Sequence, residues 1–464
     1  MNARDASGEP GRAHPHWTLV ACVLASSLSF VEGSVLNVAL PAIRHGYGAG
    51  AQEVQWVVNA YLLPLSALLL LGGALGDHFG RKILLLTGTT IFAITSLVCA
   101  LAPGLPILLA ARAAQGVGAA LLLPNSLALL NAAFRGEERG RAIGIWAAAG
   151  AASAAIAPLI GGWLVGNVGW PAIFYINIPL ALGAILIAAR FVGESRETGA
   201  GRTDYGGAVL ATAGLGGLTY ALTLWSATRT LTGQASITLA GGAVMIGGFL
   251  WVEHRRGRRA MMPLGLFANR CFSGLNLLTF LLYAAFGAAM LLIPYVLISS
   301  AGYSPVQAGL AMLPLPILMT AMSPTIGSLA ARTGPKIPLT VGPMVVAMGM
   351  SLVLLVREDS SYWMGPFPMI LVMALGMTIA VAPLTSSVLG SVEEQHVAMA
   401  SGFNSAVART GGLIATALLG AVLASEGKQM FAGFHFAMLV AAAAAALGSL
   451  VAVTMLGGVK MKTS

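Results

Sequence analysis

The chain has 464 residues, of which 57% are apolar and only 9% are charged, and its mean hydropathy is +0.84. A soluble domain carries about 25% charged residues, so this composition excludes an ordinary soluble protein. The net charge of +9 would suggest a nucleic-acid partner in a soluble protein. Here the basic residues lie in short loops between apolar runs, which indicates membrane orientation instead.

Several kinds of site are not expected. The three cysteines, Cys22, Cys99 and Cys271, fall in apolar segments and are interpreted as small buried hydrophobic residues. The seven histidines form no pair at metal-ligand spacing, and no phosphate-binding Gly-x4-Gly-Lys-Ser/Thr loop occurs. We therefore expect no metal, no cofactor, no nucleic-acid partner and no catalytic residues.

Apolar runs long enough to cross a bilayer recur along the whole chain. A membrane-spanning helix needs about 20 largely apolar residues. Fourteen such spans are predicted, at 17–41, 54–76, 82–101, 107–134, 141–166, 172–192, 206–225, 236–252, 272–298, 305–331, 337–356, 364–390, 400–424 and 433–456. An even number of spans places both termini on the same side, and the first run is too long to be a signal-peptide core.

The lysines and arginines predict the orientation. Of the 25 basic residues, four lie in loops on one side and two lie within spans, which leaves 19 on the side of the termini. Cytoplasmic loops of membrane proteins carry this excess of positive charge. The chain is thus expected to be a multi-pass protein of the cytoplasmic (inner) membrane with both termini in the cytoplasm.

A weak internal repeat divides the spans. The loop from Gly73 to Lys82 and the loop from Gly327 to Lys336 share glycine, leucine, glycine and lysine in register, which suggests duplicated bundles. The predicted organisation is a cytoplasmic tail, a six-helix bundle, a linker with two additional spans, a second six-helix bundle and a cytoplasmic tail, at 1–16, 17–192, 193–271, 272–456 and 457–464.

Motifs on the predicted spans resemble the major facilitator superfamily, and within it the fourteen-span drug:proton antiporters. The loop after span 2 is similar to the family's loop 2–3 motif through Gly73, Asp77, Gly80, Arg81 and Lys82. Span 1 carries Glu32 to Pro41, similar to the acidic motif of the fourteen-span branch, which usually has Asp in place of Glu32. Span 4 carries Arg112 to Gly118, similar to the family's span 4 motif.

Span 5 carries the residues that resemble the antiporter motif, namely Gly144, Ser153, Ala157, Pro158, Gly161 and Gly162. The motif usually has glycine in place of Ser153 and Ala157, and both replacements are still small. The resemblance also reaches Trp170 to Pro179, Asp204 with Gly207, and Ser401 to Gly412. It implies an all-α polytopic fold with two six-helix bundles and two extra central spans, and an export function rather than an enzyme activity.

Glu32 is the acidic residue placed deep within a span, and an intramembrane carboxylate is by default a functional hypothesis. Burial disfavours the charged form of a carboxyl group, and a nearby guanidinium favours it. Arg112 lies at a matching depth on span 4, and Gln115 one turn on could hydrogen-bond the same groups. We expect this pair to carry the coupling proton, and the alternative is a structural ion pair that joins spans 1 and 4.

Four polar residues within spans are candidates for the substrate cavity: Asn37, Gln115, Asn404 and Arg409. Arg409 has no evident acidic partner in spans 9–14. It could contact an anionic substrate group, backbone carbonyls or Asn404, or it could be a helix-packing residue. Five methionines of the second bundle could line an adaptable apolar cavity or simply pack: Met312, Met319, Met322, Met373 and Met377.

The loop 2–3 residues are interpreted as a conformational gate. By resemblance, Asp77 would face the end of span 13 across the bundle interface and break that contact during switching. A plain turn with inside-positive charge is the alternative. The span 5 glycines and Pro158 would let helices approach closely and shape the bundle.

The predicted function is proton-coupled export of small amphipathic compounds by alternating access. The expected partners are the substrate, protons and the lipid bilayer, and the protein is expected to act as a monomer. A dedicated exporter of one endogenous metabolite, such as a siderophore, peptide or antibiotic, is the first alternative. A proton-coupled uptake symporter and a non-transporting membrane sensor are the others.

Overall fold

The computed structural model describes residues 14–196, 205–228, 230–257, 264–357, 360–392, 397–425 and 427–456, and all regular structure in these ranges is helical. Each of the fourteen predicted spans coincides with helix. Thirteen helices in the described ranges are long and apolar enough to cross a membrane, and α5 contains a shorter apolar stretch from Ala152 to Asn167. The side on which α1 begins is called the near side below, and the opposite side is called the far side.

The first bundle is formed by α1 to α7. Its helices alternate in direction, so α1, α3 and α5 run toward the far side and the others return. Their bounds are α1 Pro15–Tyr47, α2 Ala51–Phe79, α3 Arg81–Ala100, α4 Leu105–Ala133, α5 Gly136–Asn167, α6 Ala172–Tyr175 and α7 Asn177–Phe191. Helices α6 and α7 are two parts of one span, because Pro179 lacks an N–H and its ring clashes with the carbonyl four residues earlier.

The second bundle is formed by α10 to α17. Its bounds are α10 Arg270–Ser299, α11 Pro305–Ala311, α12 Pro314–Thr333, α13 Lys336–Ser351 with the 3₁₀ turn η3 Leu352–Leu355, α14 Pro366–Gly390, α15 Val397–Ala417, α16 Gly420–Ala424 and α17 Gly427–Met455. Two spans are again interrupted. Pro314 begins α12 after the break that follows α11, whereas α15 and α16 are separated at Leu418 and Leu419 with no proline nearby.

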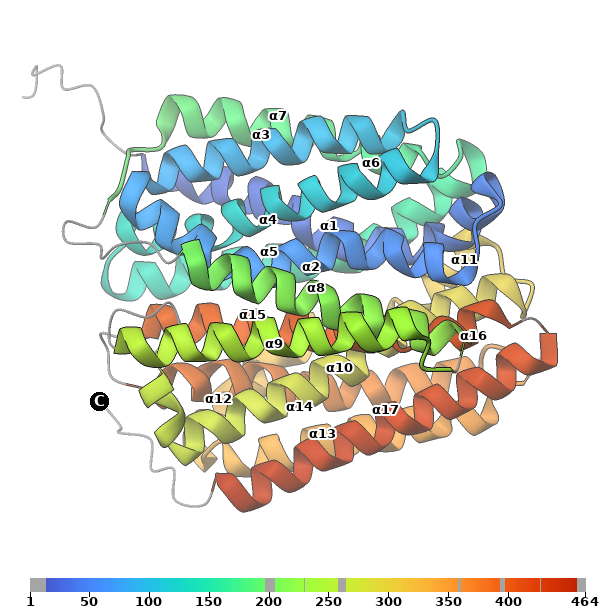
Figure 1. Ribbon diagram of the computed structural model, residues 1–464. Helices are drawn as coiled ribbons and strands as arrows, with labels where there is room; N and C mark the ends of the chain where they lie inside the picture. The colour runs from blue at the N-terminus through green and yellow to red at the C-terminus, as the bar shows by residue number, and fades with distance from the viewer. Residues whose placement is uncertain are drawn as a thin grey trace, which may run out of the picture.

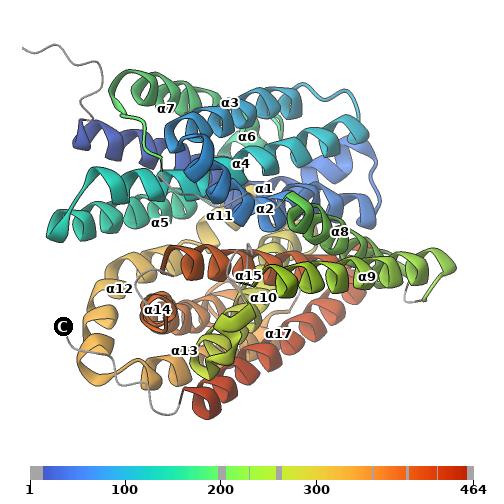
Figure 2. The same cartoon turned by 60° about the vertical axis from the view of Figure 1, so that its left-hand side comes forward.

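Helices α8 (Tyr205–Thr228) and α9 (Gly233–Arg256) form the additional pair of spans, and the 3₁₀ turn η2 (Leu264–Ala268) leads from them to α10. Figures 1 and 2 show α8 lying along the seam between the two bundles, next to α2 and α15, with α9 outside it. Only 17% of the apolar window of α9 is buried, against 61% for α1. Helix α9 is therefore peripheral, and α8 is the member of the pair that contacts both bundles.

The two bundles are closely joined at the far side. A Cβ added to Gly162 on α5 would meet the carbonyl oxygen of Pro305 at 2.4 Å, and one added to Gly309 on α11 would meet the carbonyl oxygen of Pro158 at 2.4 Å. Arg44 at the end of α1 donates hydrogen bonds across the same interface, at 2.9 Å to the Tyr295 hydroxyl and 3.1 Å to the Leu423 carbonyl.

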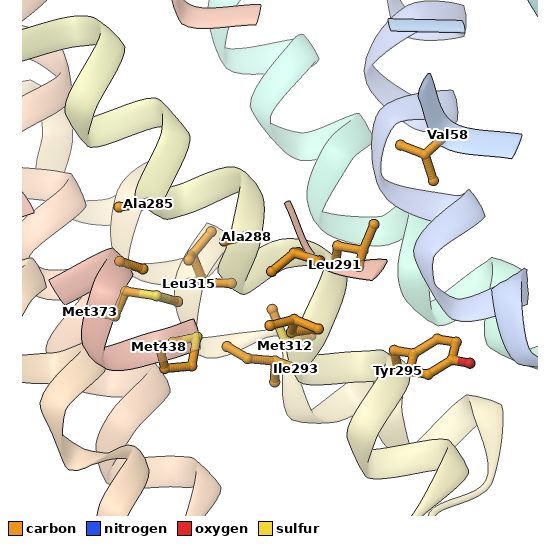
Figure 3. Packing of buried hydrophobic residues seen from close by; sticks show 14 of the residues in the cluster. Val58, Ala285, Ala288, Leu291, Ile293, Tyr295, Met312, Leu315, Met373 and Met438 are labelled. Atoms are coloured by element: carbon orange, nitrogen blue, oxygen red, sulfur yellow. The ribbon is translucent and has the colours of Figure 1, made fainter. Parts of the chain in front are cut away.

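The core of the second bundle contains much of the methionine content. Figure 3 shows Met312, Met373 and Met438 within one apolar layer that also contains Ile293 and Leu315. Met312, Met373 and Met377 are 6% exposed or less, so these three fill core space. Met319 is partly buried against the same core, and Met322 is 37% exposed.

Candidate functional site

Glu32 and Arg112 meet inside the first bundle. Glu32 on α1 has no exposed surface, and Arg112 on α4 has 1%. The Nη1 of Arg112 forms an ion pair with Oε1 of Glu32. Two charges that are both removed from water are stable only when they are paired and their remaining hydrogen-bonding atoms are satisfied.

The guanidinium of Arg112 is satisfied by further contacts. Its Nε donates to the carbonyl of Val57 on α2 at 3.0 Å, and its Nη1 also donates to Gln115 Oε1 at 2.5 Å. The ring of Tyr61 lies against it, with 4.6 Å between Cζ and the ring centroid, and the ring of Phe174 lies at 5.9 Å. These cation–π contacts favour the charged guanidinium in a site without solvent.

The second oxygen of Glu32 accepts hydrogen bonds from two amides. The Nδ2 of Asn177 donates to Oε2 at 2.8 Å, and the Nε2 of Gln115 donates to it at 3.4 Å. The same two amides donate to the hydroxyl oxygen of Ser96, at 3.3 and 2.8 Å. The network therefore joins α1, α3, α4 and α7.

Close helix packing brings these side chains together. A Cβ at Gly116 would meet the carbonyl oxygen of Tyr61 at 2.3 Å, so glycine lets α4 approach α2. A Cβ at Gly88 on α3 would meet the carbonyl oxygen of Gly118 at 2.7 Å, so α3 and α4 also approach closely. Small residues at helix contacts are a common device for close packing in membrane proteins.

Asn177, Ser96 and Tyr61 were missed by the sequence analysis. Asn177 is the first residue of α7, directly after the break in its span, and it has no exposed surface. The signal that could have revealed it is an asparagine two residues before a proline inside an apolar span. A serine or tyrosine in a span carries no such signal, because both are common at helix contacts.

The four candidate cavity residues do not lie together. Gln115 is fully buried in the Glu32 network. Asn37 is partly exposed on the same face of α1 as Gly33 and Arg44, where a Cβ at Gly33 would meet nothing within 4 Å. Asn404 and Arg409 are partly exposed on α15 in the second bundle. The structure thus separates Gln115, inside the first bundle, from the partly exposed Asn37 on α1 and from the two residues on α15.

The loop 2–3 residues contact one another and the residues that follow α7. Asp77 pairs with Arg81 at 2.7 Å, one turn on, rather than with a described residue of α15. Glu194, just after α7, accepts hydrogen bonds from the backbone of Lys82 and Ile83 at 3.0 and 3.3 Å. Gly80 has a φ of +117°, and a Cβ there would meet the Glu194 carboxylate at 2.6 Å. These contacts of the loop with described residues all lie within its own bundle, and Glu393 to His396 lie outside the described residues.

Further contacts hold the same loop. The Nη1 of Arg81 donates to Ser195 Oγ at 3.2 Å, and the Nζ of Lys82 donates to the carbonyl of Ala189 at 3.0 Å. Gly73 has ordinary van der Waals surroundings, with Pro124 Cβ 3.6 Å from an added Cβ. Its neighbour Gly76 is the tight position, where an added Cβ would meet the Asn125 side chain.

The span 5 residues fall into two groups. A Cβ at Gly161 would meet Val35 of α1 at 2.3 Å, and Gly162 and Pro158 form the close contacts with α11. A Cβ at Gly144, in the near half of α5, would meet nothing within 4 Å. Among these four residues, close approach is therefore confined to those in the far half of α5. Asp204, which also contributed to the resemblance, lies outside the described residues.

Comparison with known proteins places this architecture in a family. Residues 22–273, more than half of the chain, match the sequence profile of the Major Facilitator Superfamily. The chain belongs to the Major Facilitator Superfamily. The resemblance inferred from the motifs and the all-helical fold are thereby confirmed, as is the prediction of a transporter rather than an enzyme.

Relatives of this superfamily member include several resistance proteins. It is 33% identical to the multidrug resistance protein Stp of Mycobacterium tuberculosis, over 88% of this chain and 76% of that protein. It is 31% identical to the tetracenomycin C resistance and export protein of Streptomyces glaucescens, over 92% and 79%. It is 30% identical to the methylenomycin A resistance protein of Bacillus subtilis, over 93% and 92%.

Among solved structures, the crystal structure of peptide transporter POT in complex with sulfate has a TM-score of 0.70. The match covers 97% of this chain and 96% of that one at 13% sequence identity. This likeness supports the fold alone. The sequence relatives indicate that this chain is a multi-pass membrane transporter whose homologues are drug and antibiotic efflux proteins.

Proposed function

We propose that this protein is a proton-coupled antiporter that exports small amphipathic compounds from the cytoplasm by alternating access. It would lie in the cytoplasmic membrane with both termini inside, as the distribution of its basic residues predicts. The observation that carries the proposal is the sealed carboxylate of Glu32, paired with Arg112 and bonded to two amides.

The network contains hydrogen-bonding groups for both protonation states of Glu32. With Glu32 ionised, Arg112, Asn177 and Gln115 all donate to its oxygens. With Glu32 protonated, the carboxyl becomes a donor and needs an acceptor. Within the described residues, Asn177 Oδ1 is buried and has no hydrogen-bond partner, so a turn of this side-chain amide would present an acceptor to the protonated carboxyl group.

Loss of the proton also changes the charge inside the first bundle. Ionised Glu32 compensates Arg112, whereas protonated Glu32 leaves the guanidinium balanced only by carbonyls and aromatic rings. An equilibrium between two conformations shifts when one of them stabilises a charge better than the other. The proton on Glu32 is therefore suited to bias the position of α4 and of the far-side contact between the bundles.

Export, rather than uptake, is supported by the relatives, which are named for drug or antibiotic resistance and, in one case, for export. The residues of α5 that resemble the antiporter motif support the same direction, and two of them form the close contact with α11. A single-metabolite exporter would use the same machinery, so breadth of substrate is a separate measurement.

The test uses purified protein in sealed vesicles with an imposed pH gradient. Puromycin, tetracenomycin C and methylenomycin A are supplied separately, and protein-free vesicles correct for passive distribution. An antiporter accumulates at least one compound on the acidic side of the membrane, in either protein orientation, and a protonophore abolishes the accumulation. Accumulation on the alkaline side would mean symport, and movement that ignores the pH gradient would overturn proton coupling.

A further inference from the structure

The charges within the spans do not balance. Glu32 and Arg112 compensate each other, and Arg409 on α15 is the second arginine within a span. The acidic residues of the second bundle region all lie in the sequence between spans: Glu358, Asp359, Glu393, Glu394 and Glu426. Within the described residues, Arg409 forms no ion pair and no hydrogen bond. A guanidinium inside a membrane is costly unless an anion or dipoles compensate it.

The register of α15 against α2 shows where Arg409 points. A Cβ at Gly402 would meet Leu70 of α2 at 3.0 Å, and Gln55 of α2 donates to the carbonyl of Thr416 at 2.9 Å. Arg409 lies seven residues from both Gly402 and Thr416, which is two helical turns, so it shares their face. It therefore faces α2 midway along the seam between the bundles.

Two tyrosines lie near this position. Arg409 interacts electrostatically with the phenols of Tyr61 on α2 and Tyr283 on α10. Tyr61 is held by a 2.8 Å hydrogen bond to Ser29, and its ring contacts Arg112. Tyr61 is thus the structural link between the Glu32 network and the seam where Arg409 lies.

A further hydrogen-bond donor is available on α10. Asn404 does not share the face of Arg409, because it lies five residues earlier, about 140° around α15, and its Oδ1 accepts from Thr279 of α10 at 2.7 Å. Tyr283 lies one turn further along α10, and no hydrogen bond of its hydroxyl is found within the described chain. A Cβ at Gly412, one turn beyond Arg409, would meet nothing within 4 Å. The charge of Arg409 and the hydroxyl donor of Tyr283 thus occur on neighbouring helices, α15 and α10.

We propose that Arg409, with Tyr283, binds an anionic group of the transported compound, so that the substrates are amphipathic organic anions such as carboxylates and phenolates. This assignment rests on the proposed export function and names its substrate class. A planar guanidinium binds a carboxylate through two parallel hydrogen bonds, and the phenol hydroxyl of Tyr283 adds a further donor. The partly exposed ring of Tyr283 provides apolar surface for the rest of the molecule.

A series of ligands with one aromatic body tests the charge preference. Binding of 2-naphthoate, 2-naphthamide and 2-naphthylmethylammonium to the detergent-purified wild-type protein is measured by calorimetry at neutral pH. We expect the carboxylate to bind at least about tenfold more tightly than the amide, which corresponds to one charge-assisted contact, and the cation to bind most weakly. Equal binding of acid and amide, or tightest binding of the cation, would overturn the assignment without the need for any variant.

Variants assign the preference to Arg409. Arg409→Gln should bind 2-naphthoate no better than 2-naphthamide while its amide affinity stays within about threefold of the wild type, and Arg409→Lys should keep part of the preference. Arg190→Gln, which removes an arginine at the near end of α7, is the matched control and should bind like the wild type. A preference that persists in folded Arg409→Gln would place the anion elsewhere.

Inorganic anions are the other source of negative charge. If chloride at about 0.15 M, the physiological ionic strength, abolishes 2-naphthoate binding whereas gluconate at the same ionic strength does not, the site prefers a halide and the organic-anion assignment is wrong. These results are independent of proton coupling, because binding is measured without a gradient. A protein that exports neutral compounds in the vesicle assay but shows no acid preference would refute this inference and leave the proposed function intact.

Discussion

Gly162 on α5 packs directly against the backbone carbonyl of Pro305 on α11, and a Cβ at Gly162 would lie 2.4 Å from that oxygen. The reciprocal contact, between Gly309 and the carbonyl of Pro158, has the same 2.4 Å spacing. Backbone atoms in helices cannot move aside as a flexible side chain can. The two contacts therefore make far-side closure between the bundles dependent on the absence of two methyl groups.

We predict that Gly162→Ala disfavours far-side closure, by about 1–3 kcal/mol, the usual cost of one extra methyl group in a tightly packed contact. Transport per folded protein should fall several-fold, because alternating access needs that closure in every cycle. Gly166→Ala is the matched control, since a Cβ at Gly166 on the same helix meets nothing within 4 Å. Equal turnover of the two variants in the vesicle assay would show that α5 and α11 need not approach so closely.

A second prediction concerns the loop after α2. The side chains of Asp77 and Arg81 are 33% and 18% exposed, and partly exposed ion pairs contribute about 0–1 kcal/mol to stability. Asp77→Asn should leave thermal stability and ligand affinity nearly unchanged but slow turnover, if the loop forms its cross-bundle contact in another state of the cycle. Equal losses of affinity and turnover would instead place Asp77 in the binding site.

The membrane explains why the fold was predictable. Each span must satisfy its backbone internally and be apolar, so the fourteen apolar runs determine fourteen helical segments. The breaks in these spans were less accessible to prediction. Pro179 and Pro314 account for two of them in retrospect, but prolines inside α1, α2 and α4 leave those helices continuous. Whether a proline bends or interrupts a helix depends on neighbours that local sequence does not show.

The site was predictable in its charged part only. Glu32 and Arg112 were identified because a charge in a span is rare and their depths match. Asn177 and Ser96 join them through tertiary contacts between α7, α3 and α4, which no spacing along the chain reveals. The placement of Gln115 differs from the cavity interpretation for the same reason, since the rotation of α4 directs it into the first bundle.

A third prediction tests the orientation, which rests on the basic residues of the sequence. In a background with Cys271→Ser, the remaining cysteines, Cys22 and Cys99, are fully buried and should not react. Leu231→Cys, on the far side and 65% exposed in the wild type, should react with a membrane-impermeant maleimide added to intact cells. Arg196→Cys, on the near side, should react only after the cells are opened. The opposite labelling pattern would invert the topology.

The last prediction concerns Glu32, on which the proposed coupling depends. Glu32→Gln keeps the shape and the hydrogen-bonding capacity of the protonated acid but cannot release a proton, so pH-driven transport should be abolished while ligand binding persists. Glu32→Asp keeps a titrating group and should retain part of the activity. Glu53→Gln is the control, because Glu53 caps the start of α2 outside the network.

Loss of stability must be separated from loss of coupling in the same experiment. Glu32→Gln leaves the Arg112 guanidinium buried without its carboxylate, which typically costs about 3–5 kcal/mol for a buried pair. Adding Arg112→Gln removes the second charge, so the double variant should recover much of the melting temperature that the single variant loses. If Glu32 and Arg112 are only a structural ion pair, the folded double variant should also recover pH-driven transport. If Glu32 carries the proton, the double variant is stable yet moves no compound against the pH gradient, and full pH-driven transport by either variant would exclude Glu32 as the coupling residue.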